Sequence, residues 1–335
     1  MQAKWLLKRV EYRLKILRTL LLSDKRFKAR RFKYDFGREI QLSPPQTFNE
    51  KIIFRMLFDR NQRFTELADK VNARKFIAQR IGEKYVVPTL GIYPSFDQID
   101  LDALPQQFVI KCSHDSASAI ICTDKDKFDI ASAREKISFY LSRNMYVTTR
   151  ERHYKNIVPR IICEKYLDVF AHADRDITPE LFRVHCFAGQ PQFIEVDFTD
   201  ARGEESVNIY DPAWRRQEVC VGYIERRYPN NLDTRIRRPA RLDEMLALSR
   251  QLSADVDYCR MDWFLVGDDI YFSEFTFTPC AGRMRFFPAS VDLRFGGTVA
   301  TADSALSASC GAPRPGPSTP CIARKIRLSA APSLG

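Results

Sequence analysis

The chain has 335 residues, of which 45% are hydrophobic and 28% charged, enough for one large domain or two to three smaller ones. No run of about 18 apolar residues is present, which excludes a membrane-spanning helix. Nine scattered cysteines without C-x-x-C spacing argue against a zinc site or a disulfide framework, so we expect a cytoplasmic protein.

The net charge of +11 is concentrated at the N-terminus. Residues 1–38 hold 13 Lys and Arg against 3 Asp and Glu, whereas the other residues hold 40 and 39. No nucleic-acid recognition motif accompanies this charge, so nucleic-acid binding is disfavoured. We expect residues 1–45 to form a basic helical arm with an apolar stripe of Trp5, Leu6, Val10, Leu14, Leu17 and Leu21. Such a helix either lies on an anionic membrane surface or docks on its own protein.

The elements that follow mix helices with hairpins. The capping-box pattern from Thr47 to Glu50 predicts a helix through Leu57. Further helices are predicted at 69–81, 132–143 and 242–252, and strands at 86–88, 91–93, 108–111, 119–122, 161–163, 182–187 and 192–198. A final hairpin is predicted over 258–277, so the expected class is α+β with largely antiparallel sheets. Beyond Gly297 the Ala-, Ser- and Pro-rich sequence predicts a disordered tail over 298–335.

The final hairpin contains two acidic residues whose relative placement depends on its turn. A three-residue turn would pair Val266 with Ile270, and Asp262 would then face Glu274 directly. Opposed carboxylates repel, and Mg²⁺ between them would relieve the repulsion because it prefers oxygen ligands. Neutralisation by Arg260 at a wet edge is the alternative. A two-residue turn would place the acids on opposite faces.

The spacing R-x-D, eleven residues, then E-x-T resembles the metal-binding end of the ATP-grasp fold, and its details resemble the TupA-like family of teichuronopeptide, capsule and other surface-polysaccharide loci. The similarity extends from Phe48 to Gly297 through FNEKI (48–52), ADKVNARKFI (68–77), LPQQFVIKCSH (104–114), ERHYKNIVPRIICEKYL (151–167) and FRVHCFAGQPQFI (182–194). It implies a reduced N-terminal domain over 46–105, a first ATP-grasp lobe over 106–167, and a second lobe with the metal site over 168–297.

The resemblance also implies ATP and Mg²⁺ as cofactors and a set of site residues. The implied nucleotide contacts are Lys70, Lys111, His114, Ser116, Glu164, Lys165, Leu167, Asp168 and Arg183. The implied metal ligands are Asp262, Glu274 and Thr276. Arg260 is the implied catalytic residue, which would hold the acceptor carboxylate or its tetrahedral intermediate.

The implied activity is ATP-dependent carboxylate–amine ligation through an acyl phosphate, in cell-surface polysaccharide biosynthesis. The implied substrates are a carboxylate-bearing sugar or glycan and an amine or amino acid, handled in the cytoplasm or on the inner face of its membrane. A glycosyltransferase-type protein and a non-catalytic, membrane-associated ATP-grasp scaffold are the alternatives.

The loop after Lys111 differs from the family pattern N-H-G-S-G, because Asp115 and Ala117 stand where glycine is usual. Glycine allows close backbone approach to phosphate, and Asp115 adds a negative charge. We therefore expect replacement of both residues by glycine to tighten ATP binding.

Overall fold

The computed structural model describes residues 2–170, 178–199, 205–223, 226–227, 234 and 236–299. From residue 300 onward, the expected disordered tail lies outside this range. Among the described residues, no helix combines the length and apolar character needed to cross a bilayer. The seven described cysteines are free thiols, as expected.

The helices agree closely with the predicted segments beyond the arm. Thr47 caps the helix at 48–58 and forms the predicted capping box with Glu50. The described helices are α1 (Gln2–Leu21), α2 (Asp24–Phe36), α3 (Phe48–Phe58), α4 (Gln62–Ala68), α5 (Lys70–Arg80), α6 (Ile130–Leu141), α7 (Met145–Thr149), α8 (Leu242–Ser253) and α9 (Ser290–Gly296).

The described strands are β1 (Thr89–Tyr93), β2 (Phe108–Cys112), β3 (Ile120–Cys122), β4 (Ile161–Lys165), β5 (Thr178–Phe187), β6 (Gln190–Thr199), β7 (Glu205–Tyr210), β8 (Arg216–Gln217), β9 (Cys220–Tyr223), β10 (Arg226–Arg227), β11 (Tyr258–Val266), β12 (Asp269–Thr276) and β13 (Arg285–Phe287). The short strands β7–β10 and β13 were not predicted. Val86, expected to begin a strand, forms only an isolated bridge to Phe272.

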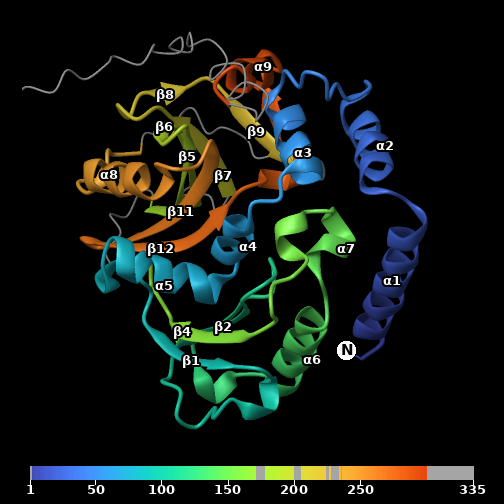
Figure 1. The fold of residues 1–335 in the computed structure, drawn as a ribbon. Helices are drawn as coiled ribbons and strands as arrows, with labels where there is room; N and C mark the ends of the chain where they lie inside the picture. Colours follow the sequence, from blue (N-terminus) through green and yellow to red (C-terminus); the bar gives the residue numbers. More distant parts are fainter. Residues whose placement is uncertain are drawn as a thin grey trace, which may run out of the picture. The chain divides into compact units, whose positions relative to one another are not determined.

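Two larger antiparallel sheets organise the fold (Figure 1). The smaller has the order β1-β4-β2-β3, and the larger has the order β12-β11-β5-β6-β7-β8. A third sheet contains β10, β9 and β13. The expected boundary between two lobes, after Leu167, falls between β4 and β5, and the proposed division into five segments remains a prediction.

The larger sheet separates an apolar face from a polar one. Val184 of β5, Val196 of β6 and Met261 of β11 lie in one buried core with Met245 and Leu252 of α8. Because side chains alternate across a strand, their neighbours in sequence point to the other face. Those neighbours are mostly charged: Arg183, His185, Glu195, Asp197, Arg260 and Asp262. The sheet therefore presents a row of ionisable groups away from α8.

The β11–β12 hairpin differs from the prediction at its turn and agrees with it at the acidic pair. Val266 pairs with Asp269, so the turn has two residues and the expected three-residue loop is wrong. A bulge then restores the register, because Trp263 pairs with Phe272 while Asp262 pairs with Glu274. The shorter turn and the bulge each shift the strand pairing by one residue, in opposite directions, so the two carboxylates face each other as predicted.

The bulged residue, Ser273, changes which side chains share a face of β12. Phe272 and Phe275 are three residues apart, yet both are buried in the core beside Trp263. Ser273 and Glu274 are consequently both directed into a cavity on the other side. Phe272 was expected on the opposite face from Trp263, and the bulge is the physical reason for this difference.

Candidate active site

A cavity of about 430 Å³ brings together residues from both larger sheets. Its walls are formed by β2, the loop after β2, β4 with the residues that follow it, and the β11–β12 hairpin. Eight of the thirteen predicted site residues line it: Lys70, Lys111, Ser116, Glu164, Lys165, Leu167, Asp262 and Glu274. Segments separated by up to two hundred residues in sequence therefore contribute to one site.

Part of this cavity is apolar and could accept a flat ring. The side chains that provide this surface are Val87, Val109, Ile121, Leu167, Phe170, Leu181 and Phe264. An apolar slot with a few polar groups at its end is the usual form of a small-molecule site. Only Leu167 was predicted, because an apolar strand residue that lines a pocket has the same sequence pattern as one in a core.

Lys111 is held at the cavity by an acidic partner. Its Nζ forms an ion pair with one carboxylate oxygen of Glu164, and Arg74 Nη1 lies 2.7 Å from the other. Glu164 is almost fully buried, so these two cations compensate a charge that water does not solvate. Arg74 was missed by the sequence analysis, although it lies one helical turn after Lys70 in α5 and this spacing could have indicated it.

Lys70 contacts both the loop after β2, at Asp115, and Glu274 of the acidic pair. It is the first residue of α5, where Asp69 caps the helix by accepting from Val71 N. Its Nζ lies 3.0 Å from Glu274 Oε2 and donates to the carbonyl oxygen of Asp115, also at 3.0 Å. Burial favours the neutral amine, but the Glu274 carboxylate outweighs it and raises the pKa of Lys70. Lys70 is therefore a fixed positive charge in the cavity wall.

The acidic pair is contacted by cations on both sides. Arg260 Nε and Nη2 each donate to Asp262 at 2.7 Å, and Nη2 lies 3.8 Å from Glu274. Burial raises the pKa of Asp262, partly offset by Arg260, while Lys70 and Arg260 outweigh burial and lower the pKa of Glu274. Asp262 is 2% exposed and the Glu274 side chain is 31% exposed, so Glu274 is the more accessible of the two carboxylates.

This donor set suits a hard divalent cation. Mg²⁺ is bound in proteins through one or two carboxylates together with substrate phosphate oxygens. Asp262 and Glu274 supply two carboxylates from directly opposed positions, and Lys70 and Lys111 line the same cavity. In the described part of the chain, no three His, Cys, Asp or Glu side chains converge as metal ligands. The arrangement thus fits a metal shared with a nucleotide better than a metal held by the protein alone.

Arg183 is placed beside the pair on the neighbouring strand. It stands opposite Asp262 across β5 and β11, with Nε 3.8 Å from Asp262 Oδ2. Its guanidinium is also paired with Asp197 and with Glu195 on β6. Arg183 is absent from the residues that line the cavity, so a phosphate contact would require this network to rearrange.

In the loop between β2 and β3, the acidic residue Asp115 has a cationic partner. Asp115 is buried, and Arg143 grips its carboxylate with two hydrogen bonds of 2.7 and 2.5 Å. Ala117 adopts φ of 64°, the left-handed conformation that glycine would favour. The left-handed conformation expected of a glycine is therefore present at Ala117, and the charge of Asp115 is neutralised by Arg143. Arg143 gave no sequence signal, since it lies 28 residues away in the chain.

Four other predicted residues lie outside the cavity lining. The His114 imidazole is buried, with Nε2 2.9 Å from the carbonyl oxygen of Arg143. Asp168 Oδ1 accepts from Phe170 N at 3.0 Å. Thr276 pairs with Arg260 across the hairpin, as predicted, and the guanidinium of Arg260 reaches the acidic pair from there. Direct nucleotide contact by His114, Asp168 and Thr276 remains a prediction.

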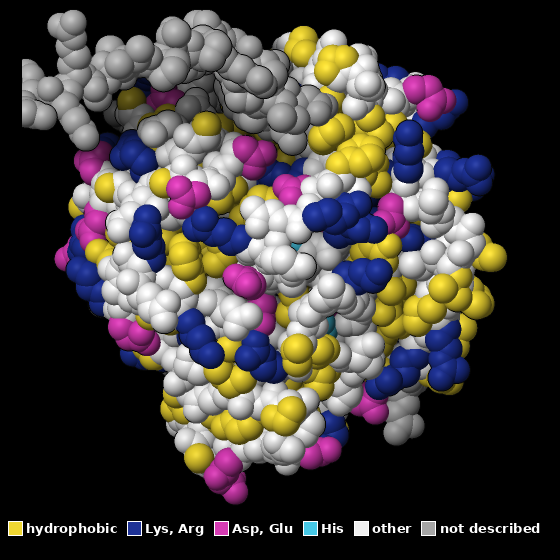
Figure 2. All heavy atoms as spheres, in the orientation of Figure 1, with side chains coloured by type: hydrophobic (Ala, Val, Ile, Leu, Met, Phe, Trp, Pro, Cys, Tyr) yellow, Lys and Arg dark blue, Asp and Glu magenta, His cyan; other side chains and the backbone are white. Residues whose placement is uncertain are grey.

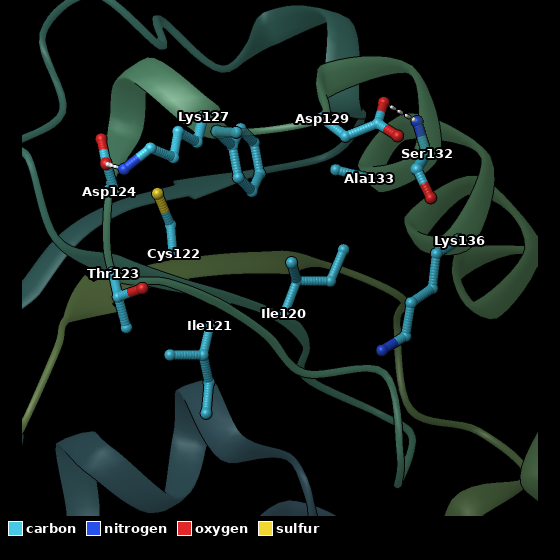
Figure 3. A pocket seen from close by; sticks show the side chains of 11 residues that line it. Ile120, Ile121, Cys122, Thr123, Asp124, Lys127, Asp129, Ser132, Ala133 and Lys136 are labelled. Atoms are coloured by element: carbon cyan, nitrogen blue, oxygen red, sulfur yellow. Dashed lines mark hydrogen bonds and ion pairs between the residues drawn. The ribbon is translucent and has the colours of Figure 1, made fainter.

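A second hollow, of about 450 Å³, lies between β3 and α6 (Figure 3). Three of its charged side chains already have protein partners, and Lys136 donates to the Ala119 carbonyl oxygen at 2.7 Å. Lys127 pairs with Asp124 at 2.6 Å, and Asp129 accepts from Ser132 N at 2.9 Å. None of the predicted site residues lies there. The predicted site residues are therefore gathered around the cavity between the two sheets and not around this hollow.

Comparison with known proteins places this fold in a family. The sequence profile of the TupA-like ATP-grasp family matches residues 50–300. This match covers more than half of the chain, so the protein belongs to the TupA-like ATP-grasp family, and its α+β architecture is the ATP-grasp fold. No curated protein sequence matches the chain.

Several solved structures resemble the fold at low sequence identity. D-alanine–D-alanine ligase from Bacillus anthracis, complexed with ATP, is 16% identical, with 70% of this chain and 58% of that chain covered and a TM-score of 0.35. The ATP-grasp ligase PsnB with a minimal precursor is 12% identical, with 70% and 62% covered and a TM-score of 0.36. D-alanyl-alanine synthetase A from Vibrio cholerae is 12% identical, with 78% and 65% covered and a TM-score of 0.35. The chain thus spans less than two thirds of the length of these structures.

Proposed function

We propose that this protein is an ATP- and Mg²⁺-dependent ligase that joins a carboxylate to an amine. The observation that supports this best is the cavity itself, where an apolar slot ends at two lysines and a pair of opposed carboxylates. The apolar slot suits an adenine ring, the two lysines suit phosphate oxygens, and the two carboxylates suit the metal that accompanies a nucleotide. Membership of an ATP-grasp family supports the same assignment.

The reaction that fits these groups has two steps. A carboxylate oxygen of the first substrate attacks the γ-phosphorus of ATP, the bond to ADP breaks, and an acyl phosphate forms. The amine nitrogen of the second substrate then attacks the acyl carbon, phosphate leaves, and a proton is lost from nitrogen as the amide forms. Mg²⁺, when bound, would neutralise phosphate charge.

The side chains of this chain contribute position and charge to both steps. Lys70 and Lys111 are held in the cavity wall by the carboxylates of Glu274 and Glu164, so their ammonium groups are already positioned for phosphate oxygens. Asp262 and Glu274 would hold the metal. Arg260, at the inner side of the pair, would stabilise the negative charge that develops on the acyl group.

For the substrates we propose a uronic-acid carboxylate on a sugar or glycan and an amino acid or other amine. The TupA-like resemblance to surface-polysaccharide loci motivates this choice. If the glycan is linked to a lipid, the enzyme would work in the cytoplasm at the inner face of the cytoplasmic membrane, and we include this location in the proposal.

The test is a product assay on the full chain. Purified protein is incubated with Mg-ATP, candidate uronic acids and amino acids, and ADP, phosphate and amide are quantified. Amide formation in step with ADP release supports the ligase. Sugar transfer without ATP turnover would instead support a glycosyltransferase. ATP binding without turnover on any substrate pair would favour the non-catalytic scaffold.

A further inference from the structure

The apolar stripe of α1 points away from the rest of the protein. Leu6, Val10, Leu14, Leu17 and Leu21 follow one another at spacings of three and four, and they are between 49% and 86% exposed. Leu7 and Leu20 of the same helix are exposed as well. A row of exposed leucines along one helix is unusual on a free surface, because it leaves a contiguous apolar patch in water.

The opposite side of α1 is the one that docks on the body. Trp5 is buried against Phe139 and Tyr140, the Tyr12 hydroxyl accepts from Asn144 N at 2.8 Å, and Thr19 lies farther along the same side. Trp5, Tyr12 and Thr19 are seven residues apart, which keeps them on one face of the helix. Leu14 follows Trp5 by nine residues, about two and a half turns, and therefore lies on the other face. The two faces are therefore opposed. The stripe predicted as one set divides here, with Trp5 turned inward and the leucines outward.

Positive charge accompanies the outward face. The helix has six Lys and Arg residues and one acidic residue, Glu11, which is paired with Lys15 at 2.5 Å. Arg9, Arg13 and Arg18 are exposed. In Figure 2, hydrophobic side chains lie next to Lys and Arg side chains over α1, at the right of the view.

We propose that the outward face of α1 binds an anionic lipid surface, with the helix lying in the plane of the membrane. The leucines would enter the boundary between headgroups and acyl chains, and the flanking arginines would contact anionic headgroups. A second copy of the chain is a poorer occupant, because two faces of the same positive charge repel each other. Since the inward face anchors α1 to α6 and α7, lipid binding would hold the catalytic body at the membrane.

The experiment measures sedimentation of the full chain with vesicles. Phosphatidylcholine vesicles with and without phosphatidylglycerol are compared at low and raised salt. Leu14→Glu combined with Leu17→Glu should weaken binding to the anionic vesicles on the order of ten-fold or more. Leu293→Glu is the matched control, because Leu293 on α9 and Leu17 are both 55% exposed. It should bind as the unaltered chain does.

A second variant tests the charge term. Arg9→Gln with Arg13→Gln should also weaken binding by about ten-fold or more and reduce its sensitivity to salt. This variant removes no apolar contact. If circular dichroism shows that the glutamate variant fails to fold, the arginine variant alone tests whether α1 binds anionic vesicles. ATP binding should be unchanged in each folded variant.

Several outcomes would overturn the proposal. Absence of vesicle binding by the full chain would do so, as would equal binding to vesicles without phosphatidylglycerol. Loss of a dimer in the leucine variant, seen by light scattering without any vesicle binding, would assign the face to a second copy of the chain. These results are independent of the ligase assay, so failure of either proposal leaves the other standing.

Discussion

At the residue scale, the Arg143–Asp115 pair changes what is expected of the loop between β2 and β3, where the sequence suggested that Asp115 weakens ATP binding. Asp115 stands where the family pattern has glycine, and its carboxylate is fully buried. Arg143 supplies two hydrogen bonds, and the Asp115 carbonyl oxygen accepts from Lys70. The loop is therefore ordered by side-chain contacts. Replacement of Asp115 by glycine removes the two hydrogen bonds to Arg143, so the tighter ATP binding expected from sequence no longer follows.

We predict that Arg143→Gln weakens ATP binding and lowers stability. It leaves the buried Asp115 carboxylate without its cation, and loss of one partner of a buried pair costs about 3–5 kcal/mol. Calorimetric ATP titration and thermal unfolding measure the two effects. Arg134→Gln is the matched control, because Arg134 of α6 is half exposed and pairs with an exposed aspartate. An Arg143→Gln variant with unchanged affinity and melting temperature would contradict this account of the loop.

We predict that Glu274→Gln abolishes ATP turnover with little change in stability. The amide removes one negative charge from the metal site, and Glu274 is accessible enough for the change to be tolerated by the fold. ADP release and thermal unfolding are the measurements. Asp269→Asn, at the exposed end of the same strand, is the control and should remain active. Asp262→Asn is a less clean test, because it also removes the charge of the carboxylate to which the buried Arg260 donates two hydrogen bonds. Full turnover by the Glu274 variant would remove the metal assignment.

At the element scale, α1 and α2 are attached to the body in different ways. In α2, Phe32 is fully buried, and Lys28 is buried with its Nζ donating to the Ala281 carbonyl oxygen at 2.9 Å. Burial lowers the pKa of this lysine. Asp24 of α2 accepts from Arg150 and Tyr146 at 2.9 Å. The arm expected as one segment over 1–45 is thus a peripheral helix followed by an integral one.

We predict that removal of residues 1–22 leaves a folded protein, whereas removal of residues 1–38 does not. The shorter truncation removes the Trp5 and Tyr12 contacts of a peripheral helix. The longer one also empties the Phe32 site and removes Asp24 from Arg150 and Lys28 from Glu151. Solubility and circular dichroism distinguish the two products. A well-folded 39–335 fragment would show that α2 is dispensable.

At the scale of the whole molecule, stability depends on buried groups that acid would protonate. His185 Nε2 donates to Glu195 at 2.6 Å, and its Nδ1 accepts from the Tyr258 hydroxyl at 3.0 Å. Burial lowers the pKa of His185 to about 4 and that of His153 to about 3. Despite burial, hydrogen bonding to His185 lowers the pKa of Glu195 to about 2.

We predict that the buried histidines lower the melting temperature as the pH falls from 7 toward 4, while Asp197, whose pKa burial raises to about 7, contributes in the opposite direction. Below pH 6.5 the unfolded chain protonates its histidines while the folded chain does not, so the unfolded state binds more protons and gains stability. Glu195 acts in the same direction below pH 4.5. Thermal unfolding at several pH values measures the effect, and His185→Gln should flatten the profile. A His185→Gln profile that falls as steeply with pH as that of the unaltered chain would contradict the assignment of His185 as a buried, uncharged group.

The sequence by itself determined the class of fold and most of the site, because both depend on local patterns. Capping residues and apolar periodicity located α3, α5 and α8, and apolar runs located β2 to β6, β11 and β12. The spacing within one hairpin predicted that Asp262 faces Glu274, and the family resemblance implied Lys70 and Lys111. All four residues line one cavity in the fold. Capping and hairpin signals lie within a few residues of each other, so they are visible before folding.

Only the tertiary structure decided the features that depend on contacts between distant segments. The Ser273 bulge follows from packing of Phe272 against Trp263 in the α8-side core, which the turn residues alone do not reveal. The partner of Asp115 comes from the end of another helix, and the apolar slot is assembled from both sheets. Likewise, helical spacing identifies the apolar residues of α1, but only its docking through Trp5 and Tyr12 shows that the leucines face outward, since periodicity is the same for a buried and an exposed face.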